Sequence, residues 1–120
     1  MTIAAVPKRP VKRHTQLVKA ILAYLAMHPG KVFAWKNNTG ALPVGNRFVR
    51  YGRRGSPDIL GVVKGGGFFG IECKVGRDRL SADQLEFCRR VRELGAIYIE
   101  ARDVEDVKHL LEGECRDSRT

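Results

Sequence analysis

Three segments of the chain carry apolar residues at the three-to-four-residue spacing of an amphipathic helix. The first runs from about residue 15 to 28 and stops at Pro29-Gly30. The second begins with Ser81 and Gln84, a capping-box pattern, and stops at Gly95. Asp103 is expected to cap the third. The expected apolar faces are Leu17, Ile21 and Leu25; Leu85, Cys88, Val91 and Leu94; and Val104, Val107, Leu110 and Leu111.

Between these helices the pattern changes to the short apolar or alternating runs of strands. Residues 37–45 are rich in turn formers and predict a loop. Residues 47–51 alternate basic and apolar side chains, which predicts a strand with one basic face. Two further runs flank Gly65-Gly66-Gly67 and predict a hairpin. The expected strands are residues 32–35, 47–51, 58–63, 68–73 and 96–99.

This arrangement predicts one α/β domain, a mixed central sheet flanked by helices in the order α-β-β-β-α-β-α. The 120 residues suit a single domain at 14–113, with a flexible basic arm at 1–13 and a frayed tail at 114–120. No apolar run is long enough to span a membrane. Three scattered cysteines without a CxxC pair argue against a disulfide framework or zinc site and favour a reducing, cytoplasmic setting.

The charge is strongly positive and unevenly distributed. The net charge is +9, and the first 57 residues hold eleven Lys or Arg and no Asp or Glu, so that Asp58 is the first carboxylate of the chain. Such a balance favours a polyanionic partner, nucleic acid in particular, over a membrane or a small-molecule substrate.

The glycine hairpin brings chemistry-bearing residues together. Side chains alternate along a strand, so Glu72 and Lys74 share one face while Cys73 points to the other. With a turn centred on Gly66, Asp58 lies opposite Lys74, and residue 60 lies opposite Glu72. The three charged groups would then share one patch.

A divalent cation explains why such a patch is tolerated. Two close carboxylates on half-buried strands repel each other and lose solvation, and a bound cation removes that penalty. Mg²⁺ prefers one or two carboxylates together with waters and phosphate oxygens. Lys74 could orient an attacking water or offset charge on a phosphate. The alternative is that Glu72 and Lys74 are solvated strand residues and Asp58 is a turn residue.

The spacing of these residues resembles a known nuclease motif. Gly55-Ser56-Pro57-Asp58, thirteen residues, then Glu72-Cys73-Lys74 is similar to the PD-(D/E)XK motif. More narrowly, the chain resembles the VRR-NUC family of that superfamily over about residues 14 to 107. The blocks that carry the likeness are Trp35-Lys36-Asn37-Asn38, Arg47-Phe48-Val49-Arg50-Tyr51-Gly52, Gly55-Ser56-Pro57-Asp58, Ile71-Glu72-Cys73-Lys74 and Leu80-Ser81-Ala82-Asp83-Gln84.

The resemblance implies a restriction-endonuclease-like core and Mg²⁺- or Mn²⁺-dependent hydrolysis of phosphodiester bonds in DNA. It implies that Asp58, Glu72 and the main-chain carbonyl of Cys73 hold the metal and that Lys74 is catalytic. Gln84 matches a glutamine of the family pattern, although helix capping explains it equally well. Stand-alone members resemble homodimeric Holliday-junction resolvases, of the kind suited to phage DNA processing, and this chain fits that group.

One position departs from the family pattern. The family commonly supplies a further metal-linked glutamate from its first helix, but no acidic residue precedes Asp58 here. His14 or Gln16 occupies that neighbourhood and could bind through water or contact DNA. The departure keeps open a non-catalytic nucleic-acid-binding module as an alternative function. A flap, non-specific or RNA-directed nuclease is a further alternative.

Basic residues on both sides of the motif are the expected contacts to the DNA backbone. Each could instead be a solvated surface residue, and Arg53-Arg54 are the strongest candidates. No recognition helix is evident, so we expect recognition of DNA shape, of branched DNA in particular, rather than of sequence. The candidates are Lys36, Arg47, Arg50, Arg53, Arg54, Arg77 and Arg79.

Overall fold

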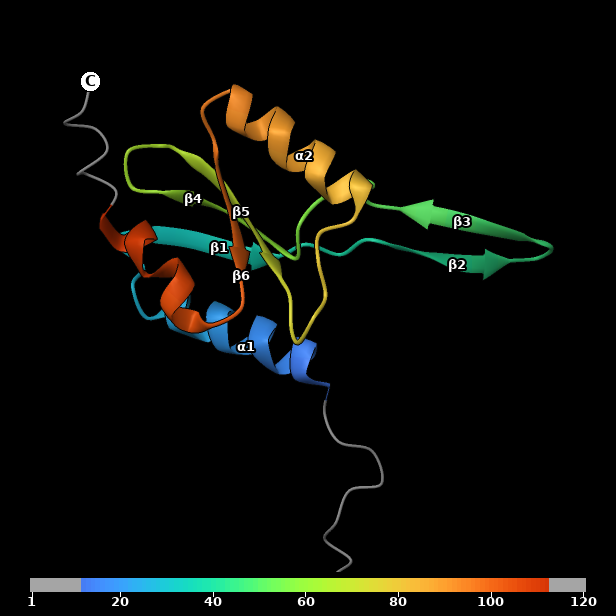
Figure 1. Cartoon of the computed structure of the whole chain (residues 1–120), viewed down its shortest axis with the longest axis horizontal. Helices are drawn as coiled ribbons and strands as arrows, with labels where there is room; N and C mark the ends of the chain where they lie inside the picture. Colours follow the sequence, from blue (N-terminus) through green and yellow to red (C-terminus); the bar gives the residue numbers. More distant parts are fainter. Residues whose placement is uncertain (1–11, 113–120) are drawn as a thin grey trace, which may run out of the picture.

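A computed structural model describes residues 12–112, which form an α/β fold with a mixed sheet between helices (Figure 1). The frayed tail lies outside these residues, as does the predicted basic arm except for Lys12 and Arg13. Lys12 is the N-cap residue of α1 and Arg13 its first residue, so the helix begins within the predicted arm. The elements are α1 (Arg13–Ala26), β1 (Val32–Lys36), β2 (Gly40–Val44), β3 (Arg47–Tyr51), β4 (Ile59–Val63), β5 (Phe68–Cys73), α2 (Ala82–Glu93), β6 (Ile97–Ala101) and the 3-10 helix η2 (Val104–Glu112).

The central sheet has four strands in the order β1-β4-β5-β6. β4 pairs antiparallel with both β1 and β5, whereas β5 and β6 are parallel. A parallel pair requires a crossover, and α2 supplies it by returning the chain from the end of β5 to the start of β6. The mixed sheet predicted from the sequence is confirmed.

A second, two-stranded sheet corrects the prediction of a loop at 37–45. Within that segment Gly40–Val44 forms β2, which pairs antiparallel with β3 and projects from the body as a hairpin (Figure 1). The tight turn at Gly45, with φ of 62°, allows the reversal. Five strands therefore lie between α1 and α2, one more than the four strand segments expected there and two more than the predicted element order contains. Pro43 is compatible with a strand here because both strands of an isolated hairpin are edges.

The hairpin also lacks the single basic face predicted for residues 47–51. Arg47 pairs with Val44 and Arg50 pairs with Ala41, so the two arginines lie on opposite faces. The reason is their separation by three positions, which in a strand changes the side on which a residue points.

The register between β4 and β5 differs by two residues from the predicted one. Ile59 pairs with Ile71 and residue 60 with residue 70, so the turn centres on Gly65 and not on Gly66. Gly65 and Gly66 both have positive φ, at 97° and 99°, and together form the reversal. Continued by one position, this register sets Asp58 opposite Glu72 instead of Lys74. A two-residue shift keeps every side chain on its face, so the shared patch survives the correction.

The two faces of the sheet are covered by different helices (Figure 1). α1 and η2 cover one face and build the main hydrophobic core with inward residues of every central strand. The core residues are Val18, Ile21, Leu25, Val32, Ile59, Val63, Phe69, Ile71, Cys73, Ile99, Ala101, Val107 and Leu110. α2 contacts β6 on the other side. No helix within residues 12–112 combines the length and apolar character needed to cross a membrane.

The predicted apolar face of α2 is wrong at two positions. Cys88 is buried and Val91 is half-buried, but Leu85 and Leu94 are exposed. Gln84 turns toward the sheet to meet a side chain of β5, and this orientation directs the adjacent Leu85 outward. The packed side of α2 is therefore Gln84, Phe87, Cys88 and Val91.

Candidate metal-binding site

Two carboxylates meet at one end of the central sheet. Asp58 immediately precedes β4 and Glu72 is the penultimate residue of β5. His14, in the first turn of α1, joins them, and one possible ligand atom from each of the three residues lies within 4.8 Å of the others. The β4–β5 hairpin and α1, the first helix of the chain, thus meet at this cluster.

Asp58 is held by the backbone of β5 and by α1. Its Oδ2 accepts a 2.9 Å hydrogen bond from the backbone N–H of Cys73 and lies 3.1 Å from Nε2 of His14. The carboxylate is partly exposed, so it remains accessible to an ion or a substrate. The backbone N–H of Cys73 therefore fixes the direction of the Asp58 side chain.

Asn37 fixes the segment that leads into Asp58. Its Nδ2 donates to Oγ of Ser56 at 2.7 Å and to the carbonyl of Pro57 at 2.9 Å, and its backbone N–H donates to the carbonyl of Asp58 at 2.8 Å. Buried Pro57 packs over Gly70, where a Cβ would lie 2.6 Å from the proline ring. The sequence suggested a turn-forming role or a contact with substrate for Asn37. It did not suggest the hydrogen bonds to residues 56–58, because these depend on tertiary structure.

Glu72 is the buried member of the cluster, with 4% of its surface exposed. Its Oε2 accepts a 3.0 Å hydrogen bond from Nε2 of Gln84 and lies 3.5 Å from Nζ of Lys74. Burial, followed by the repulsion of Asp58, raises the pKa of the Glu72 carboxyl to about 7, although Lys74 and His14 act in the opposite direction. The fold therefore holds a carboxylate in a place where one additional positive charge would stabilise it.

Each carboxylate keeps one oxygen free of hydrogen bonds from residues 12–112. The contacts above all involve Oδ2 of Asp58 and Oε2 of Glu72. Oδ1 and Oε1 are thus available, as is one imidazole nitrogen. Two carboxylates and an imidazole are a ligand set that suits a divalent cation.

Of the two candidates on the first helix, the structure brings only His14 into the cluster. Gln16 is exposed on α1 and does not line the cavity that His14 and Asp58 share. Helix one therefore offers an imidazole nitrogen in the place where the sequence lacks a carboxylate. The sequence left open whether His14 or Gln16 lies near Asp58, and in the structure it is His14.

Cys73 is placed by its backbone and not by its sulfur. Its side chain is fully buried in the core on the face opposite Glu72, as the alternation predicted. Burial raises the pKa of the thiol to about 12, so the sulfur stays neutral and apolar in character. Only its backbone groups take part in the site.

Gln84 caps α2 and also contacts the buried carboxylate. Its Oε1 accepts from the backbone N–H of Ser81 at 2.8 Å, and its own N–H donates to Oγ of Ser81 at 3.2 Å, which completes the predicted capping box. Its Nε2 simultaneously donates to Glu72. The start of α2 and the position of Glu72 are therefore coupled through one side chain.

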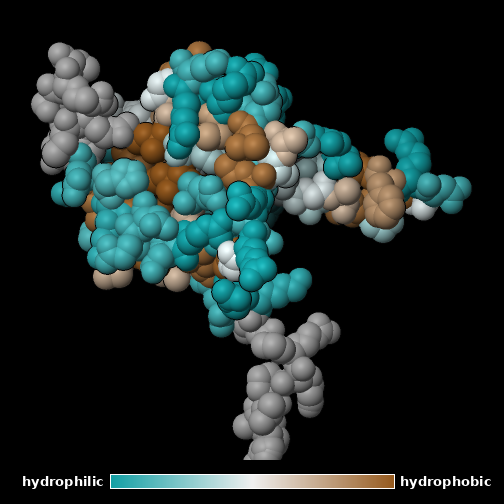
Figure 2. Space-filling model, viewed as in Figure 1, coloured by the Kyte–Doolittle hydropathy of each residue, from teal (hydrophilic) through white to brown (hydrophobic). Residues whose placement is uncertain are grey.

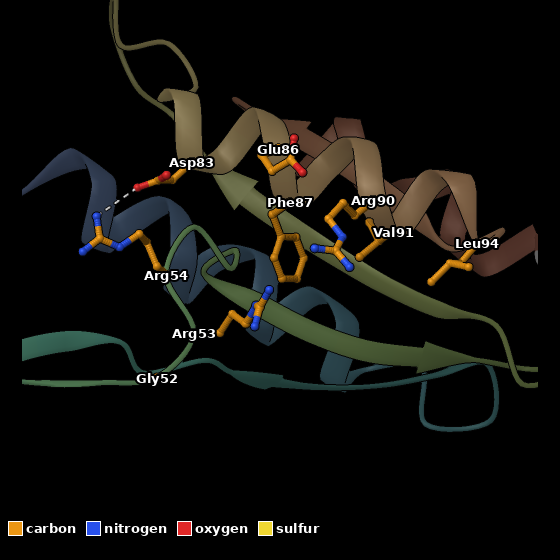
Figure 3. Close-up of a pocket in the computed structure, with 9 residues that line it drawn as sticks. All are labelled: Gly52, Arg53, Arg54, Asp83, Glu86, Phe87, Arg90, Val91 and Leu94. Carbon is orange, nitrogen blue, oxygen red and sulfur yellow. Dashed lines mark hydrogen bonds and ion pairs between the residues drawn. The ribbon is translucent and has the colours of Figure 1, made fainter.

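The candidate DNA contacts are all exposed but lie in different places. Lys36 borders a cavity of about 230 Å³ that Asp58 and His14 also line. Arg77 and Arg79 lie in the loop between β5 and α2 and line a depression that Arg102 also lines. Arg47 and Arg50 stand on the projecting hairpin, and Arg53 and Arg54 line a groove along α2 (Figure 3). Lys19, which shares the cavity with Lys36, was not among the candidates because it belongs to the exposed pattern of helix one.

Comparison with known proteins adds no relative. No family model matches the chain, and no curated protein matches it either. The residues of the site are therefore the basis for assigning a function.

Proposed function

We propose that this protein is a metal-dependent DNA endonuclease, a VRR-NUC-type member of the PD-(D/E)XK superfamily with a restriction-endonuclease-like core. The observation that carries the proposal is the convergence of His14, Asp58 and Glu72 within 4.8 Å, beside the Lys74 amine. The resemblance supplies the class of enzyme, and the geometry supports it because the acidic residues and the lysine of the motif share one end of the sheet.

Asp58, Glu72, the main-chain carbonyl of Cys73 and His14 would hold Mg²⁺ or Mn²⁺. The fit is supported by the buried Glu72 carboxyl, whose elevated pKa reports an uncompensated cost of ionisation. A divalent cation in such a site polarises a phosphoryl oxygen and makes a bound water more acidic. The cost of burying Glu72 is then offset by the ion.

The remaining residues of the site orient and balance charge. Lys74 is only 13% exposed at its side chain and lies 3.5 Å from Glu72, so it would place a positive charge next to the scissile phosphate. Gln84 keeps Glu72 in one orientation, and Asn37 does the same for the backbone that carries Asp58. These contacts would keep the two carboxylates close to each other and to His14.

The proposed substrate is DNA, with branched DNA favoured by the resemblance. The charge of +9 supports a polyanion. The exposed lysine and arginines around the site would bind phosphates without reading bases. They are Lys36, Arg47, Arg50, Arg53, Arg54, Arg77 and Arg79.

A homodimer belongs to the same proposal, and exposed apolar surface supports it. Both faces of the β2–β3 hairpin carry apolar side chains, among them Phe48 at 75% exposure, and an isolated two-stranded hairpin is at best marginally stable. Phe33 and Trp35 are also exposed on β1, with ring centroids 5.5 Å apart. In Figure 2 apolar surface is visible both on the hairpin and on the body beside α2. Surfaces of this kind on a small domain mark interaction sites.

Cleavage of a panel of DNA substrates tests the function. Duplex, flap, splayed and four-way DNA are incubated with the protein, with and without Mg²⁺ or Mn²⁺. The proposal expects metal-dependent nicking that Asp58→Ala and Lys74→Ala abolish while DNA binding remains. The remote Lys64→Gln is the control for the positive charge that Lys74→Ala removes. Cleavage that survives in both site variants would refute the assignment. Gel filtration with light scattering tests the dimer.

A second candidate is a nucleic-acid-binding module without catalysis. One observation favours it. The first helix contributes the imidazole of His14 where the family commonly has a carboxylate, which is a negatively charged metal ligand. That function predicts salt-sensitive DNA binding with no cleavage under either metal. The same substrate panel distinguishes the two functions.

A further inference from the structure

We infer that the groove between α2 and the loop 52–54 binds an unpaired strand of nucleic acid and leads it to the carboxylates. The inference rests on the proposed function, because it states where part of the substrate lies and that this part is single-stranded. The groove has a volume of about 790 Å³. The lining residues that matter here are Arg53, Arg54, Asp83, Glu86, Phe87 and Arg90 (Figure 3).

The groove is more basic than its composition suggests, because both of its acidic residues already have cationic partners. Asp83 pairs with Arg54 at 3.4 Å. Glu86 pairs with Arg89, a residue outside the groove, at 2.6 Å. Arg53 and Arg90 have no ion pair within residues 12–112, so two guanidinium groups remain to meet an anion. A phosphate backbone complements this arrangement.

An aromatic ring lies between these two arginines. Figure 3 shows the Phe87 side chain directed from α2 toward the loop, with the guanidinium groups of Arg53 and Arg90 on either side of it. Phe87 is half-buried, and its ring centroid lies 6.3 Å from that of Tyr98 beneath it. The exposed part of the ring therefore forms the floor of a basic groove.

An aromatic floor with basic walls is the chemistry that binds single strands. Every base has a flat face that can stack on a phenyl ring, and guanidinium groups hold the adjacent phosphates. Inside a duplex both faces of each base are already stacked on neighbouring base pairs. The Phe87 ring therefore cannot stack on them. The groove thus selects unpaired nucleotides, such as those of a flap or an opened branch point.

One end of the groove lies next to the candidate site in sequence, because Asp83 lines the groove and the following residue contacts Glu72. Gly55 packs against the first turn of α2 so closely that a Cβ would lie 2.4 Å from the carbonyl oxygen of Asp83. Its φ of 80° also favours glycine. The residue after Asp83 is Gln84, which hydrogen-bonds Glu72. A strand in the groove would therefore pass from Phe87 to the carboxylates along a single turn of helix.

Fluorescence anisotropy of the metal-free full chain in EDTA tests this inference without any requirement for cleavage. The probes are a blunt duplex and the same duplex with roughly ten unpaired nucleotides at the 5′ or 3′ end, within the site sizes of single-strand binders. We expect tighter binding of one extended probe than of the blunt one. Phe87→Leu should weaken binding of that probe at least roughly five-fold, since stacking contributes about 1–3 kcal/mol per base. It should leave the blunt duplex unchanged.

The arginines have a separate signature. Arg53→Gln and Arg90→Gln should each reduce the slope of log affinity against log salt by about 0.7 for the extended probe. Tyr24→Leu, on the opposite side of the sheet, and Lys64→Gln, at the β4–β5 turn, are the matched controls and should change neither quantity.

Three results would overturn the inference: equal affinity for blunt and extended probes, a loss in Phe87→Leu that is the same for both, or a dimer that Phe87→Leu dissociates without affecting the extended probe. The last would assign the groove to a second copy of the chain. Failure of the proposed nuclease function has a different signature, namely intact selective binding by a protein that cleaves nothing with Mg²⁺ or Mn²⁺.

Discussion

Gln84 joins the first turn of α2 to the buried carboxylate of Glu72. Its Nε2 donates to Oε2 of Glu72 at 3.0 Å while its Oε1 accepts from the backbone of Ser81. Because one amide satisfies both partners, the helix cannot shift without moving the carboxylate. This relationship makes the geometry of the site a property of the fold and not of a flexible loop.

Gln84→Ala should lower the free energy of unfolding by about 1.5–3 kcal/mol, since it removes half of a capping box and a hydrogen bond to a buried acceptor. Ser81→Ala removes the cap alone and should cost about 1 kcal/mol. Urea denaturation of both variants measures the difference. Equal losses in the two would mean that the contact with Glu72 contributes nothing.

The pH dependence of stability should carry the signature of Glu72. Its pKa rises from 4.5 to about 7 on folding, so the folded state holds this proton more tightly. The stability from this group is complete below pH 4.5 and is lost as pH rises through 7, by about 3 kcal/mol.

Denaturation in EDTA at pH 5 and pH 8 measures this loss. Glu72→Gln cannot ionise and should lose less stability between the two pH values than the unaltered protein. Mg²⁺ should restore stability at pH 8 to the unaltered protein and not to the variant. The same decline with pH in both proteins would contradict the assignment of the raised pKa to a buried, ionising Glu72.

His14 should influence which metal binds. An imidazole nitrogen suits transition metals more than Mg²⁺, so His14→Ala should weaken the stabilisation by Mn²⁺ more than that by Mg²⁺. His14→Glu supplies the missing helix-one carboxylate and should strengthen the effect of Mg²⁺. Metal-dependent shifts of the melting temperature measure both changes. Gln16→Ala, at an exposed position of the same helix, is the control. If it alters the metal-dependent shift of the melting temperature as much as His14→Ala does, His14 is not a metal ligand.

Asn37 should be necessary for the position of Asp58. Asn37→Ala removes the Nδ2 donor from both the carbonyl of Pro57 and the hydroxyl oxygen of Ser56, which should cost about 1–3 kcal/mol of stability. It should also weaken metal binding, because the segment that carries Asp58 loosens. Asn38→Ala, at the adjacent exposed position, should stay within about 0.5 kcal/mol of the unaltered protein. Matching effects at the two positions would show that Asn37 only forms a turn.

Local patterns predicted most of the central fold. The periodic spacing of Ile21 and Leu25 identified α1, the glycine run identified the β4–β5 hairpin, and Ser81 with Gln84 identified the start of α2. These features depend on neighbours in sequence, which is why they could be recognised. The convergence of Asp58 and Glu72 also followed, since alternation along a strand is insensitive to a two-residue shift in register.

Other features depended on contacts that no local pattern encodes. The β2 strand was missed because Pro43 and Gly45 are turn formers, and only pairing with β3 makes the segment a strand. Leu85 was assigned to the core because it is apolar, whereas the hydrogen bond of Gln84 to Glu72 rotates it to the surface. The hydrogen bonds from Asn37 to residues 56–58 join segments about twenty residues apart. They too could be recognised only from the tertiary structure.

The most direct test of the account is a crystal of the protein soaked with Mn²⁺ and measured for anomalous scattering. The account predicts one strong peak roughly 2.0–2.3 Å from carboxylate oxygens of both Asp58 and Glu72. That peak should be absent from the Asp58→Ala variant. A fully soaked crystal with no peak between these two residues, or with the ion bound elsewhere in the chain, would contradict it.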